Sequence, residues 1–212
     1  MYKRQAPVIA IATCSIINYP SIDLSAVPIK VHGIHNRKNA QVAAAIAGAL
    51  KVPNEAIRKS LSDFEGTWRR FEYKGETESG ALVYDDYAHN PQKVRAALQG
   101  AREAFPRKRL VVVFQPHLYS RTKTLLSEFK RSFSDADELI LAPIFAAREE
   151  NDPSISSEIL AAAAREEGSD AVSLPDFDSI EKHLRATLKK GDALITIGAG
   201  DVYKIGENLL RR

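Results

Sequence analysis

The residues best suited to chemistry are two adjacent acids, a tyrosine and a histidine. Asp85-Asp86-Tyr87 ends an apolar run, and His89 follows two residues later. On an extended segment the side chains of Asp85 and Asp86 point to opposite faces, so they cannot form a catalytic pair of carboxylates. We expect one acid to face the end of a strand and the other to cap a turn or form a local pair. For Asp86, capping a turn is the main alternative to a binding role.

A helix start follows these residues. Asn90 can cap the helix by accepting from its first free amides, and Pro91 suits the first helical position. Apolar residues then recur at helical spacing, at positions 94, 97, 98 and 101. Open α/β sheets bind ligands at such a turn, because the ends of strands and the starts of helices converge there.

Strands and helices alternate over the rest of the chain. Strands are expected at 81–84, 110–114, 138–141, 171–174 and 193–197, with an edge strand at 70–73, and helices at 91–104, 122–133, 157–165, 179–188 and from about 202. This alternation predicts the α/β class, with a mostly parallel sheet covered by helices on both faces.

The first part of the chain has a different pattern. Extended segments are expected at 8–12 and 27–31, and residues 33–39 open an alanine-rich helix that covers 40–50. Val52-Pro53-Asn54 marks the start of a second helix, and the helical spacing ends near Gly66. We therefore expect a domain boundary near Gly66, between residues 1–66 and residues 67–212.

Basic residues occur at two further positions of interest. His117 follows the strand at 110–114, and Arg121 lies at the start of the next helix, which Ser120 or Thr122 would cap. A guanidinium beside a helix N-terminus favours an anionic ligand. Arg69-Arg70 lies where the two parts of the chain join. These two arginines could clamp a phosphate or form salt bridges.

Two nucleotide-binding signatures are incomplete or absent. Gly198-Ala199-Gly200 lies between a strand and a helix, but Tyr203 stands where a dinucleotide fingerprint has its third glycine. We favour a tight turn, or a backbone nest for a carboxylate or phosphate, over a nicotinamide or flavin site. The sequence contains no G-x-x-x-x-G-K-[ST] loop, the usual device for holding nucleotide phosphates.

Composition excludes several classes of protein. With 212 residues and 44% hydrophobic content the chain can bury a substantial core, and its net charge of +3 comes without the clustered basic residues of a nucleic-acid surface. The single cysteine excludes a disulfide framework and suits a reducing cytoplasm. The histidines are too scattered to indicate a metal site, and no apolar stretch could span a bilayer. We expect a cytoplasmic protein that binds neither nucleic acid nor membrane.

Motifs spread in order along the chain resemble those of the Mur ligases, and within that family the members that join L-alanine to UDP-N-acetylmuramate. The matching residues are Gly33-x-His35-Asn36-x-x-Asn39, Arg69-Arg70-Phe71, Asp85-Asp86-Tyr87-Ala88-His89-Asn90-Pro91, Phe114-Gln115-Pro116-His117-x-Tyr119-Ser120-Arg121-Thr122, Ala147-Arg148-Glu149 and Gly198-Ala199-Gly200-Asp201. The chain departs from many members at Leu118, where a second arginine often stands, and at Asn90, where a histidine often stands.

The resemblance implies a domain organisation. Mur ligases have a domain for the UDP-sugar, a central P-loop ATPase domain and a C-terminal Rossmann-like domain. Residues 1–66 resemble the tail of the ATPase domain, and residues 67–212 resemble the whole C-terminal domain. The P-loop lysine, the Mg²⁺ ligands and the UDP pocket would then lie upstream of Met1, and the chain would be inactive alone.

The resemblance also implies a reaction that uses ATP. The muramyl carboxylate would receive a phosphoryl group from ATP, and the amine of alanine would attack the resulting acyl phosphate. Asn36 and Asn39 would bind adenine, since an amide offers both a donor and an acceptor. Arg70 would be the catalytic residue that contacts the γ-phosphate, and Asp86 would bind the ribose hydroxyls.

The amino-acid substrate would lie on the other side of these groups. The resemblance implies that four residues line this side, with Arg121 paired to the carboxylate of alanine: Tyr87, His89, His117 and Arg121. Two other functions stay open. A free-standing Rossmann-like module could bind a nucleotide or metabolite without an ATPase, and a nicotinamide oxidoreductase would bind NAD.

Overall fold

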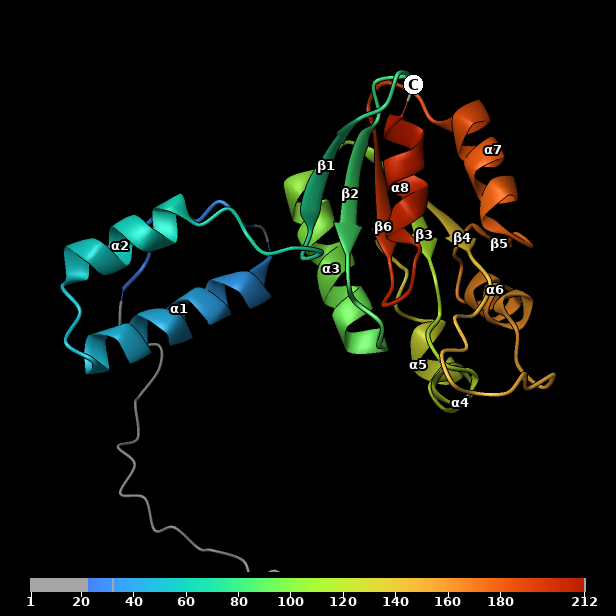
Figure 1. Cartoon of the computed structure of the whole chain (residues 1–212), viewed down its shortest axis with the longest axis horizontal. Coiled ribbons are helices and arrows are strands. Elements are labelled where there is room, and N and C mark those ends of the chain that lie inside the picture. The colour runs from blue at the N-terminus through green and yellow to red at the C-terminus, as the bar shows by residue number, and fades with distance from the viewer. Residues whose placement is uncertain (1–22, 32, 212) are drawn as a thin grey trace, which may run out of the picture.

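The computed structural model describes residues 23–31 and 33–211, without the side chain of His35. The extended segment expected at 8–12 lies outside these residues. The described chain forms two parts joined by a linker, residues 64–71. Figure 1 shows a pair of helices in the first part and a sheet flanked by helices in the second.

A single sheet organises the larger part. Its strands in chain order are β1 (Glu72–Glu76), β2 (Leu82–Asp86), β3 (Arg109–Phe114), β4 (Glu138–Leu141), β5 (Ala171–Ser173) and β6 (Asp192–Ile197). Across the sheet the order is β1-β2-β6-β3-β4-β5, and β1 alone among these strands runs antiparallel to its neighbour. The edge strand expected at 70–73 begins at Glu72, because the residues before it form a turn.

Helices cover both faces of the sheet. On one face lie α3 (Pro91–Ala104), α5 (Leu126–Phe129) and α6 (Ser157–Glu166), and on the other lie α7 (Phe177–Thr187) and α8 (Tyr203–Leu210). Neighbouring residues of β3 face opposite cores: Val112 belongs to the first and Val111 to the second. The predicted α/β class, with a Rossmann-like, mostly parallel sheet, is confirmed.

One predicted helix is divided. In place of the helix expected at 122–133 the structure has α4 (Tyr119–Thr124) and α5, with a break at Leu125 and an end at Phe129, four residues before the predicted one. After the break, Phe129 and Phe133 both pack against Phe114 at the end of β3, as the apolar spacing predicts. The spacing therefore reports the buried face correctly and conceals the interruption of the backbone.

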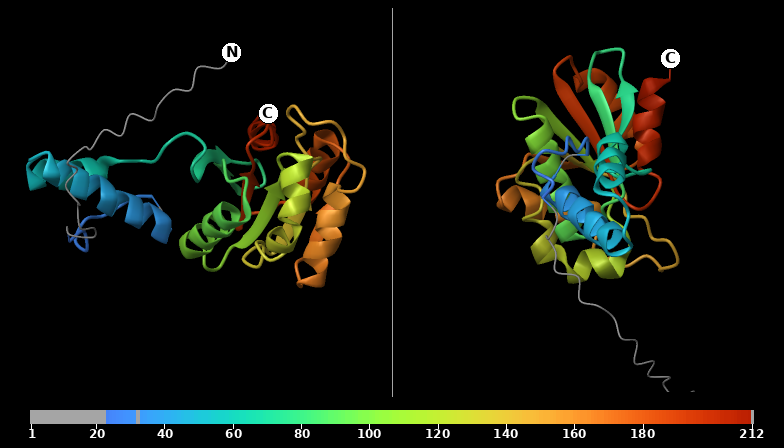
Figure 2. Two further views of the ribbon diagram at one scale, coloured as in Figure 1. Left: turned by 90° about the horizontal axis from the view of Figure 1, so that it is seen from below. Right: turned by 90° about the vertical axis from the view of Figure 1, so that its left-hand side faces the viewer.

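The first part of the described chain consists of α1 (Ile34–Ala49), α2 (Asn54–Asp63) and the segment before them. Its core contains Leu24, Val27, Ala40, Ala44 and Ile57, whereas the two cores of the sheet contain only residues that follow Gly66. The left view of Figure 2 shows these helices standing away from the sheet at the end of the linker.

The strand predicted at 27–31 is absent, and that prediction was wrong. Val27 and Ile29 pack against α1 and α2, and within the described part of the chain no strand pairs with this segment. Its apolar residues therefore reflect packing on helices rather than a place in a sheet. Between residues 23 and 211, apart from residue 32, no helix is long and apolar enough to cross a membrane.

The predicted cap of α3 generates a first test. The side-chain oxygen of Asn90 accepts from the backbone N–H of Lys93 at 2.9 Å, and Pro91 is the first helical residue. Asn90→Ala should lower the free energy of unfolding by about 0.5–2 kcal/mol, measured by urea denaturation, because one helical amide loses its acceptor. Asn90→Asp keeps an acceptor in the same place and is the matched control. An alanine variant as stable as the wild type would contradict the capping role.

Candidate functional site

A cleft of about 640 Å³ lies between the N-terminal helices and the sheet. This volume is typical of sites for small ligands. Its walls include Asn36 and Asn39 of α1, Arg70 of the linker and Asp86 at the end of β2. All four residues that the sequence resemblance assigned to ATP therefore border one cavity, although they come from three separate segments.

The N-terminal half of α3 forms a further wall that sequence reasoning did not assign. Gln92, Lys93, Ala96 and Ala97 line the cleft from one face of this helix, as their spacing requires. The sequence did offer one signal: Lys93 lies in the first turn of the helix that follows Asp86. Together with Arg70, Lys93 gives the cleft a second cation.

Asp86 both borders the cleft and holds the local backbone. One carboxylate oxygen accepts from the N–H of Phe71 at 2.9 Å, and the other accepts from the N–H of Ala88 at 2.7 Å. Burial raises the pKa of the Asp86 carboxyl, and these two hydrogen bonds and the charge of Arg70 oppose that rise. The turn-capping alternative is therefore observed, and it coexists with a place at the cleft.

Asp85 points the other way, into the sheet domain. Its carboxylate accepts from Arg69 Nε at 2.6 Å and from the hydroxyl of Thr196 at 2.6 Å. The expected opposite orientation of the two acids is confirmed. Burial raises the pKa of the Asp85 carboxyl, and the bonds from Arg69 and Thr196 act against that rise.

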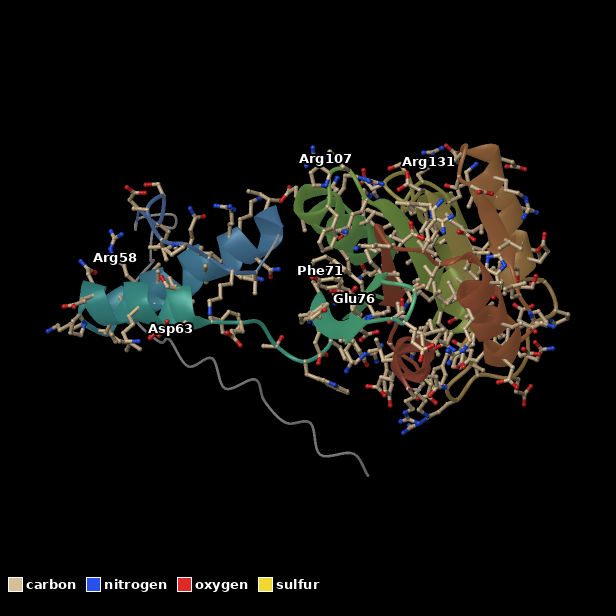
Figure 3. All side chains as sticks on the ribbon, turned by 90° about the horizontal axis from the view of Figure 1, so that it is seen from above. Arg58, Asp63, Phe71, Glu76, Arg107 and Arg131 are labelled. Carbon is tan, nitrogen blue, oxygen red and sulfur yellow. The ribbon has the colours of Figure 1, made fainter. Side chains whose placement is uncertain are left out.

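The two arginines of the linker also separate. Arg69 is 3% exposed and forms a buried salt bridge with Asp85, whereas Arg70 is exposed and lines the cleft. The sequence left a phosphate clamp and a salt bridge open for both. Only Arg70 lies where it could contact a ligand in the cleft. Figure 3 shows the next residue, Phe71, where the linker reaches the sheet domain, and its ring stacks on Tyr84 with centroids 4.7 Å apart.

The four residues assigned to the amino-acid side form one continuous group. The ring of Tyr87 meets His89 edge-on at 5.5 Å, and the rings of His89 and His117 lie 6.2 Å apart. Arg121 Nη1 donates to His117 Nδ1 at 3.2 Å. These residues come from the segments that follow β2 and β3, which lie on either side of β6 at the same edge of the sheet.

Both histidines of this group favour the neutral form. Burial lowers the pKa of His89, and the charges of Lys93, Arg121 and Arg70 lower it further. Burial, Arg121 and His89 likewise lower the pKa of His117. His89 Nδ1 lies 2.9 Å from the carbonyl oxygen of Tyr87, so Nδ1 carries the proton there and Nε2 is an acceptor. A neutral imidazole in this position can accept a proton.

The start of α4 differs from the prediction. Neither Ser120 nor Thr122 caps this helix: Leu118 occupies the cap position, and the hydroxyl of Thr122 donates back to the carbonyl of Leu118 at 2.8 Å. Glu149, from a distant loop, accepts from the N–H of Ser120 at 3.0 Å and also bonds its hydroxyl. These bonds lower the pKa of the Glu149 carboxyl. A carboxylate already holds this helix end, so the positive potential expected there is partly neutralised.

The glycine turn after β6 serves packing. A Cβ atom at Gly200 would lie 2.5 Å from the side-chain oxygen of Gln115 and 2.9 Å from the ring of Phe145. The same Gln115 oxygen accepts from the N–H of Val202. The interpretation as a tight turn holds, and its close contacts explain the glycine. Within the described ranges, no cluster of three or more His, Cys, Asp and Glu side chains could hold a metal ion.

Comparison with known proteins identifies the family. The family model described as "Mur ligase, glutamate ligase domain" matches residues 69–200. The chain belongs to the Mur ligase family. A UDP-N-acetylmuramate–L-alanine ligase of Acetivibrio thermocellus is 47% identical over 186 residues, which are 87% of this chain and 39% of the relative. One of Desulfitobacterium hafniense is 44% identical, over 94% of this chain and 44% of the relative.

Solved structures place this Mur ligase chain in the same fold. The UDP-N-acetylmuramate–alanine ligase of Thermotoga maritima superposes with a TM-score of 0.72 at 26% sequence identity, over 85% of this chain and 38% of the other. The chain thus spans about two fifths of the length of the curated relatives it matches. Its similarity lies with the C-terminal portion of such ligases.

The histidines of this Mur ligase domain predict a pH dependence of stability. Both have a pKa below the ordinary value of 6.5, so on acidification the unfolded chain takes up protons before the folded chain does. The free energy of unfolding should therefore fall between about pH 7.5 and about pH 5.5, measured by urea denaturation. The double variant His89→Asn, His117→Asn should show a flatter profile. A double variant whose profile falls as steeply toward acid as that of the wild type would contradict the environment described for the two rings.

Proposed function

We propose that the chain is the C-terminal part of an ATP-dependent ligase that joins L-alanine to UDP-N-acetylmuramate in peptidoglycan synthesis. In this proposal residues 1–66 are the end of the central ATPase domain, and residues 67–212 are the C-terminal domain. The names of the relatives, which match at 47% and 44% identity, support this assignment. A cytoplasmic location would suit the nucleotide substrate and the single cysteine.

The observation that carries the proposal is the composition of the cleft. Two amides, two cations and a carboxylate border one cavity: Asn36, Asn39, Arg70, Lys93 and Asp86. Amides suit the edge of a base, a carboxylate suits ribose hydroxyls, and cations suit phosphates. These groups match the three parts of a nucleoside triphosphate.

The cleft and the group that contains Tyr87, His89, His117 and Arg121 would carry out different steps of the reaction. Arg70 would stabilise the charge that develops during phosphoryl transfer. Arg121 would pair with the carboxylate of alanine, while Tyr87 and the two neutral histidines border its amine. An amino acid must lose the ammonium proton before it attacks, and His89 Nε2 would be available as an acceptor.

In this proposal the P-loop and the metal site belong to domains of the ligase that this chain does not span. In the proposal, the central domain supplies the lysine of the P-loop and the ligands of Mg²⁺, and the first domain binds the UDP-sugar. Acyl phosphates hydrolyse readily, so the cleft would have to close over the intermediate. The part of the linker between α2 and Arg69 is the natural place for that movement.

The experiment joins this chain to the upstream part of the Acetivibrio thermocellus relative, in place of the C-terminal portion that it matches. The joined protein should release phosphate from ATP only when both UDP-N-acetylmuramate and L-alanine are present. The upstream part alone is the control. Release of phosphate with another amino acid but not with alanine would contradict the proposed substrate. Tight binding of ATP or a metabolite by the chain alone, without restored turnover, would favour a free-standing module.

Two substitutions in that joined protein should separate the sides of the site. Arg70→Ala should lower kcat by about 10²–10³-fold, because a group that stabilises transition-state charge is lost, with little change in the KM for alanine. Arg121→Ala should raise the KM for alanine about tenfold to a hundredfold, because a charge-assisted hydrogen bond is worth about 1.5–3 kcal/mol. Steady-state kinetics measures both, and each variant is the control for the other. Equal effects on ATP and alanine in either variant would count against its role.

A further inference from the structure

Arg69 lies beside the site but takes no part in the roles proposed above. Its guanidinium donates to Asp85 Oδ2 at 2.6 Å, to the carbonyl of Gly200 at 3.0 Å and to the carbonyl of Gly198 at 2.6 Å. The side chain is 3% exposed. All three nitrogen atoms of the guanidinium therefore have protein acceptors, and Arg69 could bind a phosphate only by breaking these bonds.

The acceptors of Arg69 belong to two different strand ends. Asp85 lies at the end of β2, and Gly198 and Gly200 follow β6, which pairs with β2 in the sheet. Three rings surround the same guanidinium, with centroids 4.7 Å away for Tyr203, 5.0 Å for Tyr87 and 5.8 Å for Trp68. One side chain thus fixes the linker to two strand ends and supports the ring of Tyr87.

The backbone around Arg69 is strained. Arg69 has a φ of 53° and Phe71 a φ of 48°, and few residues other than glycine adopt such values. These two residues flank Arg70. The N–H of Arg69 donates to Glu72 Oε2 at 2.9 Å, and the N–H of Phe71 donates to Asp86. Strain of this kind persists where the surroundings impose it, and it is concentrated at functional sites.

A backbone hydrogen bond connects Arg69 to the amino-acid side. The N–H of Tyr87 donates to the carbonyl of Arg69 at 2.8 Å. Arg69 therefore determines the position of Arg70 through the chain and of Tyr87 through this bond and the ring contact. Arg70 borders the cleft, whereas Tyr87 belongs to the group with His89 and His117.

We propose that Arg69 is a positioning residue that aligns the nucleotide side of the site with the amino-acid side. The inference rests on the proposed function, because alignment matters when an acyl phosphate formed on one side meets an amine held on the other. A displacement of about 1 Å in such an encounter can cost about a hundredfold in rate. Lysine cannot replace Arg69, since an ammonium group lacks the planar fork that reaches three acceptors in two strand ends.

The test compares Arg69→Lys with Arg70→Lys in the joined ligase, and thermal unfolding of each variant gives the folded fraction. Arg69→Lys should raise the KM for ATP and the KM for alanine together and lower kcat about a hundredfold. Arg70→Lys should affect ATP and kcat and leave the KM for alanine unchanged. If Arg69→Lys lowers only the melting temperature, Arg69 is merely structural; if it changes only the KM for ATP, Arg69 acts on the nucleotide directly. Either result overturns the proposal.

A milder variant covers the case in which Arg69→Lys does not fold. Thr196→Val removes one hydrogen bond to Asp85 and leaves Arg69 in place. It should raise both KM values in the same direction as Arg69→Lys, by a smaller factor. Unchanged constants in a folded Thr196→Val protein, whose Asp85 has lost that bond, would overturn the proposal.

A spectroscopic measurement separates this proposal from the proposed function. In the chain alone, Thr196→Val should shift the backbone amide resonances of both Arg70 and Tyr87, although the hydroxyl of Thr196 bonds only Asp85 and the carbonyl of Tyr84. Shifts restricted to the neighbours of Asp85 would overturn the alignment. If the joined ligase shows no turnover but both resonances move, the proposed function fails and the coupling through Arg69 stands.

Discussion

The site depends on the end of β2, where two carboxylates bind the linker. Asp85 turns inward and holds Arg69, while Asp86 turns outward and holds the N–H of Phe71, so two adjacent carboxylates fix the linker to the sheet. Removing one partner of a buried ion pair costs about 3–5 kcal/mol, because the other charge is left uncompensated. The pair therefore specifies where the linker lies. This constraint sets Arg70 against the cleft and leaves Tyr87, one residue beyond Asp86, on the opposite side.

Local signals predicted most of the fold. Asn90 and Pro91 start α3 at the predicted residue, because a helix cap depends on atoms a few positions apart. The buried strands were equally clear, because continuous apolar runs between turn signals are typical of a parallel sheet. The failures involve distant partners. Apolar residues at 27–31 cannot reveal whether a strand lies alongside, and the sequence near Ser120 gives no sign that Glu149 holds the start of α4.

The site could be predicted only as far as the family resemblance reached. That resemblance named Asn36, Asn39, Arg70 and Asp86, and the structure brings them to one cleft. Residue types alone did not separate Arg69 from Arg70, because the carbonyls that accept from Arg69 lie 129 and 131 residues away in the sequence. Nor did the resemblance identify Lys93, whose place at the cleft follows from the packing of α3 beside the linker. Contacts across such distances in sequence arise from topology, which local patterns do not contain.

The most direct measurement of the central claim is a nuclear magnetic resonance titration of the chain with ATP. If the cleft is a nucleotide site, the amide resonances of Asn36, Asn39, Asp86 and Lys93 should shift together along one binding curve. These four residues come from both parts of the chain, so a common curve would require both walls of the cleft to contact one ligand. Shifts confined to the glycine turn at Gly198 and Gly200, or no shift at the cleft at millimolar ATP, would contradict it.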